Sequence, residues 1–351
     1  MMERRAVIQD LRPLKGLLPE EMEAVAVEEG EAPFAGRVLL DWLYRDGVET
    51  FSDMTSLKKG FRHRLAKRYR MTEAKIAGEE RSDDGTVKLL LEMSDGVRIE
   101  TVIIPEASHT TLCVSTQAGC GRSCAFCATG RVKLKRNLTA GEIVDQVSIA
   151  RRRAPVTNIV FMGMGEPLDN YENVRRAAIL LTSPRAFGMG KRHVTLSTSG
   201  VAPNIVRLAE DRMPVHLTVS LNAPDDALRS RIMPVNRTWP IAALMASCRE
   251  YTALTRQTVT FAYVLMSDIN DAPAHAVRLA SLARSIGAKV NLIPLNRTPD
   301  RVRPDCGPLE RPSDDRIARF QSALKDRGVL ALLRREHGSE IAAACGQLAL
   351  A

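Results

Sequence analysis

The chain has 351 residues, of which 45% are hydrophobic, and its 50 Lys and Arg against 41 Asp and Glu give a formal net charge of +9. The length and the hydrophobic fraction indicate a globular protein with one large domain and an appendage, or two domains, and the basic balance suits a polyanionic partner without identifying one. Residues 1–30 lack the apolar segment of a signal peptide, and no stretch approaches the ~20 apolar residues of a membrane span, so we expect a cytoplasmic protein.

Residues 1–72 are expected to form an N-terminal helical domain. Apolar residues recur at helical spacing over residues 35–54, and a basic stretch, LKKGFRHRLAKRYR, covers residues 57–70. A basic stretch of this kind is also found on a solvent-exposed helix face that binds nothing, which is the alternative. We assign residues 1–72 to an RNA-binding accessory domain.

Residues 73–105 are expected to link this domain to the rest of the chain as a β-hairpin. The apolar runs at 87–93 and 97–105 lie on either side of Ser94, Asp95 and Gly96. Asp-Gly between two such runs is typical of a tight hairpin turn.

The remainder, residues 106–351, alternates strand-like apolar runs with helical patterns. The expected strands are 111–115, 158–163, 193–199, 215–221, 259–266 and 289–295. The expected helices are 140–152, 171–182, 203–211, 240–254, 272–286 and 314–327. Such a series predicts an α/β fold with parallel strands, arranged as a partial or full (β/α)6 barrel, with an open doubly wound sheet as the alternative.

Polar residues follow several of these strands at the point where each strand ends. They are Gly165 and Glu166, Ser197 to Ser199, Ser220 and Asn222, and Asn296. The carboxyl ends of parallel strands meet at one face, so these residues predict a single site. Ser, Thr and Asn are also ordinary helix caps and loop residues, which is the alternative for any one of them.

Three cysteines lie close together in the sequence GCGRSCAFCATG, at Cys120, Cys124 and Cys127. Seven cysteines in a chain without a secretory signal indicate thiols or metal ligands rather than a disulfide framework. The spacing C-x3-C-x2-C can hold an iron–sulfur cluster by three irons and leave the fourth iron open for another ligand. Zinc is the main alternative, but the nearest histidine is His109 and structural zinc sites usually come as two ligand pairs. Three ordinary free cysteines are the other alternative.

This cysteine spacing, with Phe126 before the last cysteine, resembles the radical S-adenosylmethionine (SAM) superfamily. The resemblance implies a partial barrel and a 4Fe–4S cluster whose open iron is chelated by SAM, which is then cleaved by one electron to a 5′-deoxyadenosyl radical. The sequence GMGEP, residues 163–167, resembles the glycine-rich motif that contacts the SAM amino group, with Glu166 as acceptor.

Segments along nearly the whole chain are similar to one family within that superfamily, the dual-specificity 23S rRNA and tRNA adenine C2-methyltransferases. They are residues 112–130, 160–170, 194–200, 291–296 and 342–348, together with 34–57 in the N-terminal region. The resemblance implies that a first SAM methylates Cys345, that a radical from a second SAM activates this methyl group for addition to adenine, and that Cys113 resolves the protein–RNA adduct, leaving a disulfide between the two cysteines. Either cysteine could instead be a small buried core residue.

The same resemblance assigns further residues. It places the acceptor of the ring proton at Glu100, for which a solvent-facing strand glutamate is the alternative. It implies SAM contacts at Gly165, Glu166, Ser197, Ser220, Leu221, Asn222 and Asn296. The family usually has histidine where this chain has Asn222, a change that backbone contacts would survive. The stretch 297–313, which contains Cys306, is longer than the family pattern, and we leave Cys306 and Cys248 without a role.

Three basic stretches are possible RNA contacts: residues 57–70, 131–137 and 151–153. Each could equally be solvated charge, and 131–137 is favoured because it directly follows the cysteine loop. The 4% aromatic content argues against an extended stacking platform for single strands.

We therefore predict a radical SAM methyltransferase that acts on C2 of an adenine in 23S rRNA, with tRNA as a further substrate and flavodoxin or a ferredoxin as reductant. Methylation of C8 in the resistance-conferring branch is the close alternative. A noncatalytic RNA-binding protein with a structural metal, and a different radical SAM enzyme in which Cys113 and Cys345 are core thiols, are the others.

Overall fold

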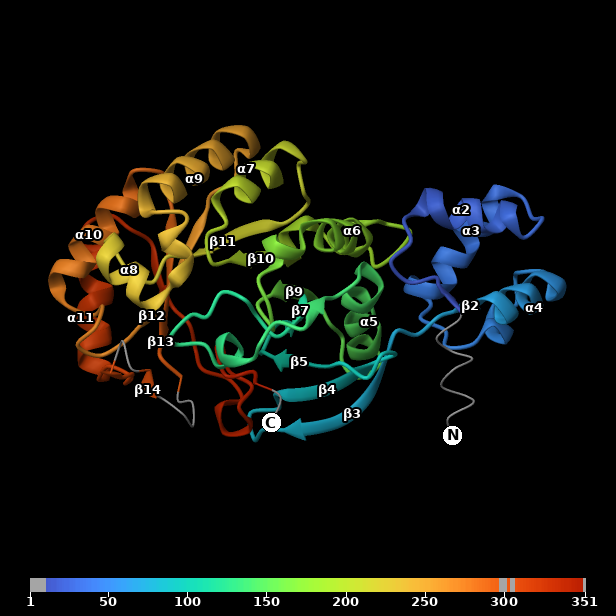
Figure 1. The fold of residues 1–351 in the computed structure, drawn as a ribbon, viewed down its shortest axis with the longest axis horizontal. Helices are drawn as coiled ribbons and strands as arrows, with labels where there is room; N and C mark the ends of the chain where they lie inside the picture. The colour runs from blue at the N-terminus through green and yellow to red at the C-terminus, as the bar shows by residue number, and fades with distance from the viewer. Residues whose placement is uncertain (1–10, 297–301, 304–306, 350–351) are drawn as a thin grey trace.

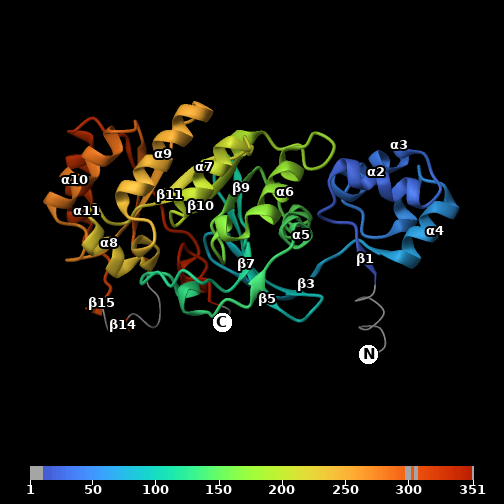
Figure 2. The same ribbon diagram turned by 45° about the horizontal axis from the view of Figure 1, so that its top comes forward.

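The computed structural model describes residues 11–296, 302–303 and 307–349 (Figure 1). Cys306 and part of the long stretch after Asn296, residues 297–301 and 304–306, lie outside these residues. A group of helices forms one end of the molecule, and a larger α/β body forms the other, as two views agree (Figure 1, Figure 2).

The N-terminal group confirms the helical prediction. Its elements are β1 (Arg12–Pro13), α2 (Pro19–Glu28), α3 (Pro33–Leu40), a single wider turn (Asp41–Arg45), α4 (Lys59–Arg68) and β2 (Tyr69–Arg70), with β1 parallel to β2. α2 and α3 each begin at proline, which is pre-organised for the first helical position. They approach closely at Gly36, where an added Cβ would lie 2.4 Å from the Met22 carbonyl oxygen. Met22, Leu39 and Phe61 form part of the buried core between the helices.

The larger body is built on one continuous sheet of ten strands, in the order β16-β13-β12-β11-β10-β9-β6-β5-β4-β3. The parallel strands are β6 (Thr110–Cys113), β9 (Asn158–Phe161), β10 (Val194–Thr198), β11 (His216–Ser220), β12 (Thr260–Leu265), β13 (Lys289–Pro294) and β16 (Ala331–Leu333). The six strands expected from the sequence are all present, close to their predicted ends. β16 was not expected, because so short a strand carries too little pattern to be recognised.

Helices cover the outer face of this sheet and confirm the predicted series (Figure 1). They are α5 (Ala140–Arg151), α6 (Tyr171–Thr182), α7 (Ala202–Glu210), α8 (Asp226–Ile232), α9 (Ile241–Thr255), α10 (Pro273–Arg284) and α11 (Asp314–Lys325). The sequence did not predict α8, a polar helix of seven residues capped by Asp225, whose carboxylate accepts a hydrogen bond from the Leu228 amide at 2.9 Å. The barrel prediction is thus confirmed, and the doubly wound alternative is set aside.

The predicted hairpin is present as β4 (Val87–Met93) and β5 (Arg98–Pro105), but it extends the barrel sheet instead of standing apart from it. β5 runs antiparallel to β6, with Val102 opposite Cys113. A further strand, β3 (Ala74–Arg81), adds to the free edge of β4. The sequence of β3 is charged and contains glycine, so it lacks the apolar alternation that predicts a strand. Such a sequence is typical of an edge strand.

The segment after β16 crosses to the opposite end of the same sheet. The Asp84 carboxylate, in the turn between β3 and β4, accepts a hydrogen bond from the Gly338 amide at 3.1 Å. The Glu340 carboxylate accepts one from the Asp83 amide at 2.9 Å, and Lys88 Nζ donates to the Ile341 carbonyl at 2.6 Å. Residues 334–348, called here the C-terminal segment, therefore bridge the two edges of the sheet.

A buried polar cluster joins the N-terminal helices to the barrel. Lys15 forms an ion pair with Asp145 of α5, and the Asp145 carboxylate also accepts hydrogen bonds from the Glu73 and Ala74 amides at 2.8 and 2.9 Å. Beside it, Glu73 Oε1 is buried and has no hydrogen-bond partner among the described residues. Burial outweighs the nearby Arg70 and raises the pKa of Glu73 to about 7.

Glu73→Gln is expected to stabilise the protein above pH 7 and to change little below pH 5. The pKa of Glu73 rises from 4.5 to about 7 on folding, so between these values the folded state binds more protons than the unfolded state. The contribution of Glu73 to the free energy of unfolding therefore falls as pH rises from 4.5 to about 7, by up to about 3 kcal/mol.

Urea unfolding at pH 5 and pH 8 measures this difference. Glu210→Gln, at an exposed position, is the control. An equal pH dependence in wild type and Glu73→Gln would contradict the prediction.

Among the residues that the structure describes, no helix is both long and apolar enough to cross a membrane.

Candidate functional site

The cysteine loop follows β7 (Gln117–Ala118), leads to β8 (Arg136–Asn137), and is folded tightly on itself. Gly119 has φ +83°, and an added Cβ there would lie 2.4 Å from the Lys133 carbonyl oxygen. An added Cβ at Gly130 would lie 2.9 Å from the Cys124 carbonyl oxygen. These glycines allow the backbone segments of the loop to approach each other closely.

The three thiols of this loop line one cavity of about 170 Å³, here called the cluster cavity. Burial raises the pKa of Cys120 to about 12 and raises the pKa of Cys124 and Cys127 above the ordinary value. Such thiols are deprotonated when a metal binds to them, because the metal supplies the positive charge that stabilises the thiolates. Apolar neighbours, including Phe126 and Phe161, line the same cavity.

The donor set fits a 4Fe–4S cluster. Each thiolate of such a cluster binds a different iron, so the three sulfur atoms need to face one cavity without meeting at a point. In the described ranges, no three His, Cys, Asp or Glu side chains converge as ligands of a single metal ion would.

Residues at or just beyond the ends of several parallel strands also line the cluster cavity. Gly165, Glu166, Ser197, Ser220 and Asn296 all line it. The structure thus brings together, at one face of the barrel, five of the seven residues for which the sequence predicted SAM contacts.

Glu166 is buried, and its carboxylate is held firmly inside the protein. It accepts hydrogen bonds from the Leu168 amide at 3.0 Å, Thr198 Oγ1 at 2.7 Å and the Ser199 amide at 2.7 Å. Burial raises its pKa, and these donors oppose the shift. Three hydrogen bonds therefore hold the Glu166 carboxylate and fix the loop after β9, and they limit how many further hydrogen bonds it can accept from a ligand.

The other two predicted SAM contacts, Leu221 and Asn222, lie next to this wall but do not line the cavity. Asn222 adopts a left-handed conformation, φ +56°, which asparagine tolerates better than most residues. Its Oδ1 accepts a hydrogen bond from the Val264 amide at 2.8 Å, and its Nδ2 donates to Met233 Sδ at 3.2 Å. The Asn222 side chain thus fastens the end of β11 to β12.

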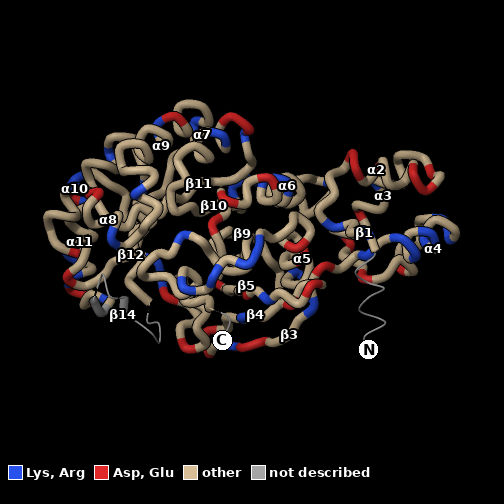
Figure 3. Tube along the Cα trace, viewed as in Figure 1, with Lys and Arg blue, Asp and Glu red and all other residues tan. Residues whose placement is uncertain are grey.

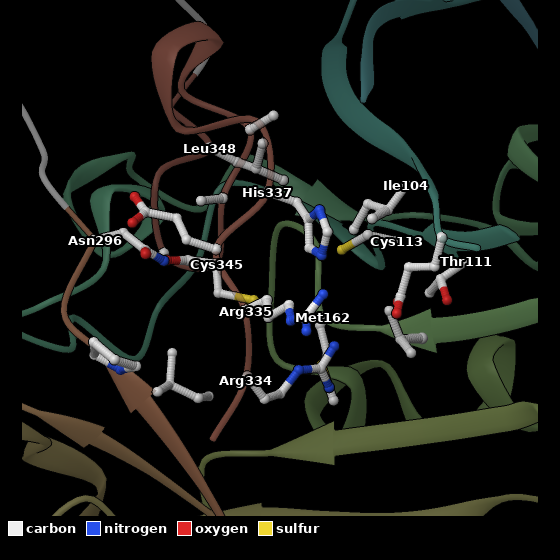
Figure 4. A pocket seen from close by; sticks show the side chains of 18 of the residues that line it. Ile104, Thr111, Cys113, Met162, Asn296, Arg334, Arg335, His337, Cys345 and Leu348 are labelled. Carbon is white, nitrogen blue, oxygen red and sulfur yellow. The ribbon is translucent and has the colours of Figure 1, made fainter. Parts of the chain in front are cut away.

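A second, larger cavity of about 500 Å³ adjoins the first and is here called the substrate cavity. Cys113 lines the substrate cavity, whereas Cys345 lines both cavities. Figure 4 shows Cys113 and Cys345 on different sides of the substrate cavity, with the side chains of Arg334, Arg335 and His337 reaching into it.

The C-terminal segment holds Cys345 against the cysteine loop. The Ala128 amide donates a hydrogen bond to the Gly346 carbonyl at 2.7 Å, and Thr129 Oγ1 donates to the Leu348 carbonyl at 2.6 Å. Asn296 Nδ2 donates to the carbonyl of Cys345 itself at 2.8 Å. Both Cys113 and Cys345 are free cysteines, and burial raises the pKa of Cys113 while the nearby Arg334 opposes that shift.

Glu100 lies in β5 and lines neither of these cavities. It is buried, not solvent-facing, and its carboxylate lies 3.7 Å from Lys88 Nζ. Ile104 lies on the same face of β5 as Glu100, four positions further along the strand, and it does line the substrate cavity. The proposed role of Glu100 as proton acceptor stays a prediction.

Sequence reasoning missed the basic residues Arg334, Arg335 and His337, which line the substrate cavity. One sequence signal could have indicated them: the basic residues Arg334 and Arg335 directly follow a short apolar stretch. Because β16 was not recognised, nothing marked this run as lying at the carboxyl end of a strand.

The basic stretch at 57–70 is partly neutralised within and beside the N-terminal helices. Arg68 pairs with Glu28 and Glu29 at 2.6 and 2.7 Å, and Arg64 pairs with Glu31 at 2.8 Å. Figure 3 shows Lys and Arg positions along α4 and Asp and Glu positions near α2 and α3.

The stretch at 151–153 is also engaged internally. Arg152 pairs with Glu49 at 2.9 Å, Arg153 pairs with Glu79 at 3.4 Å, and the Arg151 guanidinium lies 4.9 Å from the ring centre of Phe187.

The stretch at 131–137 differs from the other two. Arg136 pairs with Asp95 and Glu142, but Arg131, Lys133 and Lys135 are exposed and have no ion pair within the part of the chain that the structure describes.

The comparisons with known proteins agree with this geometry. Residues 114–280 match the Radical SAM superfamily, and residues 13–71 match the ribosomal RNA large subunit methyltransferase N-terminal domain. The chain is 44% identical to the dual-specificity RNA methyltransferase RlmN of Anaeromyxobacter dehalogenans, covering 98% of this chain and 93% of that protein. It is 42% identical to the protein of the same name from Geotalea uraniireducens, covering 95% and 96%.

A solved structure shows the same architecture. The crystal structure of a radical SAM methyltransferase from Sphaerobacter thermophilus superposes with a TM-score of 0.91 at 45% sequence identity, covering 96% of this chain and 99% of that one. The fold, the cysteine loop and these near full-length similarities agree, and the chain belongs to the radical SAM superfamily and, within it, to the RlmN family of RNA methyltransferases.

Proposed function

We propose that the protein methylates C2 of an adenine in 23S rRNA, and that tRNA is a second substrate. The observation that carries the proposal is the position of Cys345, which lines both the cluster cavity and the substrate cavity. A methyl group carried on this sulfur could be reached from both sides. The name dual-specificity RNA methyltransferase, borne by the relatives, supports two RNA substrates.

The cofactors implied by the superfamily are a 4Fe–4S cluster and SAM, two molecules of SAM per turnover. We assign the cluster to Cys120, Cys124 and Cys127. SAM would contact Gly165, Glu166, Ser197, Ser220 and Asn296 from the cavity wall, and Leu221 and Asn222 through the backbone. When bound, the cluster and SAM supply methyl transfer and one-electron hydrogen abstraction.

The protein's own residues then divide the remaining work. Cys345, as a thiolate, accepts a methyl group and later presents it to the adenine in the substrate cavity. Cys113, across that cavity, releases the product from Cys345, and a disulfide between these two cysteines would be left for reduction. Glu100 accepts the ring proton in this scheme, and its burial beside Lys88 requires a group or a movement that connects it to the cavity.

We further propose the division of the chain into an RNA-binding accessory domain at 1–72, a linking hairpin at 73–105 and a catalytic barrel at 106–351. A flavodoxin or ferredoxin would serve as reductant, and the ribosomal RNA substrate indicates a cytoplasmic enzyme. Exposed cations around the two cavities, Arg131, Lys133, Lys135 and Arg335, would contact RNA phosphates.

Arg335→Gln is expected to weaken RNA binding and to lower the slope of log Kd against log salt by about one. Arg335 lines the substrate cavity at the carboxyl ends of the strands. Arg327→Gln is the matched control, because Arg327 follows the end of α11, and helix ends of a βα barrel lie at the opposite face. Filter binding of an rRNA fragment over a salt series measures the slopes, and parallel lines for wild type and Arg335→Gln would contradict the assignment.

The function itself is tested by nucleoside mass spectrometry. Unmodified 23S rRNA is incubated anaerobically with iron-reconstituted protein, a reductant and methyl-labelled SAM. Labelled 2-methyladenosine is the expected product. Labelled 8-methyladenosine would place the protein in the C8 branch instead, and the absence of both, with SAM cleavage intact, would overturn the proposed substrate.

A further inference from the structure

Arg229, in α8, is a fully buried arginine that the proposed chemistry does not use. Its side chain has 0% of its surface exposed, and no carboxylate among the described residues lies within ion-pair distance of it. An unpaired buried charge costs several kcal/mol, so this position demands an explanation.

All the hydrogen-bond partners of the Arg229 guanidinium in the described residues are neutral. It donates to the carbonyls of Ser199 at 2.6 Å, Ser220 at 3.1 Å and Leu221 at 3.0 Å, and to Asn236 Oδ1 at 2.9 Å. The three carbonyls lie where β10 and β11 end, and Ser199 and Ser220 line the cluster cavity. The guanidinium therefore lies one hydrogen bond behind the cavity wall.

Two carboxylates are each reached through one intervening residue. The Ser199 amide donates a hydrogen bond to Glu166 at 2.7 Å, on the far side of the peptide whose carbonyl accepts from Arg229, and Asp226 is reached through Asn236. Asn236 Nδ2 donates to Asp226 Oδ1 at 3.0 Å, and Asp226 is exposed at the start of α8. Water screens an exposed carboxylate, so Asp226 compensates little of the buried charge.

The cysteine loop packs directly on α8. The Ala125 amide donates to the Ile232 carbonyl at 2.8 Å, and Cys124 and Phe126 pack with Leu228 in a small apolar cluster. Burial lowers the pKa of Arg229 to about 10, and the interaction with Cys124 opposes that shift. Arg229 therefore remains charged at neutral pH, in a poorly solvated region next to one of the three thiols.

We propose that Arg229 is the internal counter-charge of the iron–sulfur cluster and favours its reduced state. The proposal rests on the assignment of Cys120, Cys124 and Cys127 as cluster ligands. Three thiolates give a 4Fe–4S cluster a net negative charge, and the reducing electron adds one more in a site of low dielectric. A fixed positive charge behind the wall stabilises that electron. Arg229 lines neither cavity and acts as a positioning residue, through the strand-end carbonyls and through its field.

The test compares Arg229→Lys, which keeps the charge, with Arg229→Gln, which removes it. Redox titration of the reconstituted cluster, followed by electron paramagnetic resonance in the absence of SAM, gives the midpoint potential. At the wild-type midpoint, Arg229→Gln is expected to show a reduced-to-oxidised ratio about tenfold lower, and Arg229→Lys a ratio close to wild type. Arg151→Gln is the matched control, because burial also lowers the pKa of the half-buried Arg151, which lies at the end of α5.

Iron content shows whether each variant retains the cluster, and circular dichroism shows whether it is folded. A folded Arg229→Gln that loses iron, while Arg229→Lys and Arg151→Gln keep it, supports the counter-charge. Unchanged potentials in Arg229→Lys and Arg229→Gln overturn it, and so do equal shifts or equal iron loss in both, since guanidinium geometry would then be the cause. A wild-type protein that binds no cluster would refute the ligand assignment, and a wrong RNA product leaves these potentials unaffected, so the failures are distinguishable.

Discussion

Cys345→Ala is expected to abolish RNA methylation, by at least about 10³-fold, while the cluster and SAM cleavage remain intact. The reason is positional, because Cys345 is the only cysteine of the described residues that lines both cavities. Its side chain is exposed, so the substitution removes the methyl carrier without opening a hole in the core.

Two assays on the same reconstituted sample measure this result. Labelled methyl incorporation into rRNA reports turnover, and release of 5′-deoxyadenosine reports SAM cleavage. Cys248→Ala is the matched control, because Cys248 is a free cysteine buried in α9 that lines neither cavity. Full turnover by Cys345→Ala would end the carrier hypothesis.

Cys120→Ala is expected to lose the cluster and, with it, both SAM cleavage and methylation. Two remaining thiolates hold such a cluster poorly, because a third iron then lacks a protein ligand. Cys120 is partly exposed and lies in a loop, so we expect the barrel itself to stay folded.

Iron and sulfide analysis, with electron paramagnetic resonance of the reduced protein, measures the loss. Circular dichroism verifies the fold, and Cys248→Ala again serves as the control. A Cys120→Ala protein with a full complement of iron and an unchanged spectrum would refute the ligand set.

Much of the barrel could be predicted from sequence because its signals are local. Apolar runs of strand length alternate with amphipathic helices, and each pattern occupies enough residues to be recognised. β16 and α8 were missed because they are short, and β3 because its exposed edge position selects charged residues. In these three elements the fold is decided by neighbouring strands and helices, which a local pattern does not contain.

The site was predictable only in part for a similar reason. The cysteine spacing and the strand-end residues are sequence signals, and the structure brings most of them to one cavity. The charges were harder to interpret. Arg64 and Arg68 looked available for RNA, but they face acidic residues of α2 and of the turn after it, and these partners lie far from them in the sequence.

The bridging C-terminal segment has a consequence for how the protein is made. Glu340 and Ile341 hydrogen-bond to Asp83 and Lys88, groups that lie near the other end of the chain. Contacts of such sequence separation form late and slowly, after the local helices and strands. While the chain is being synthesised, the β3–β4 turn and the cysteine loop lack these partners until residues 338–348 emerge. These contacts and Cys345 belong to one short segment, so a chain that terminates before residue 338 would lack both.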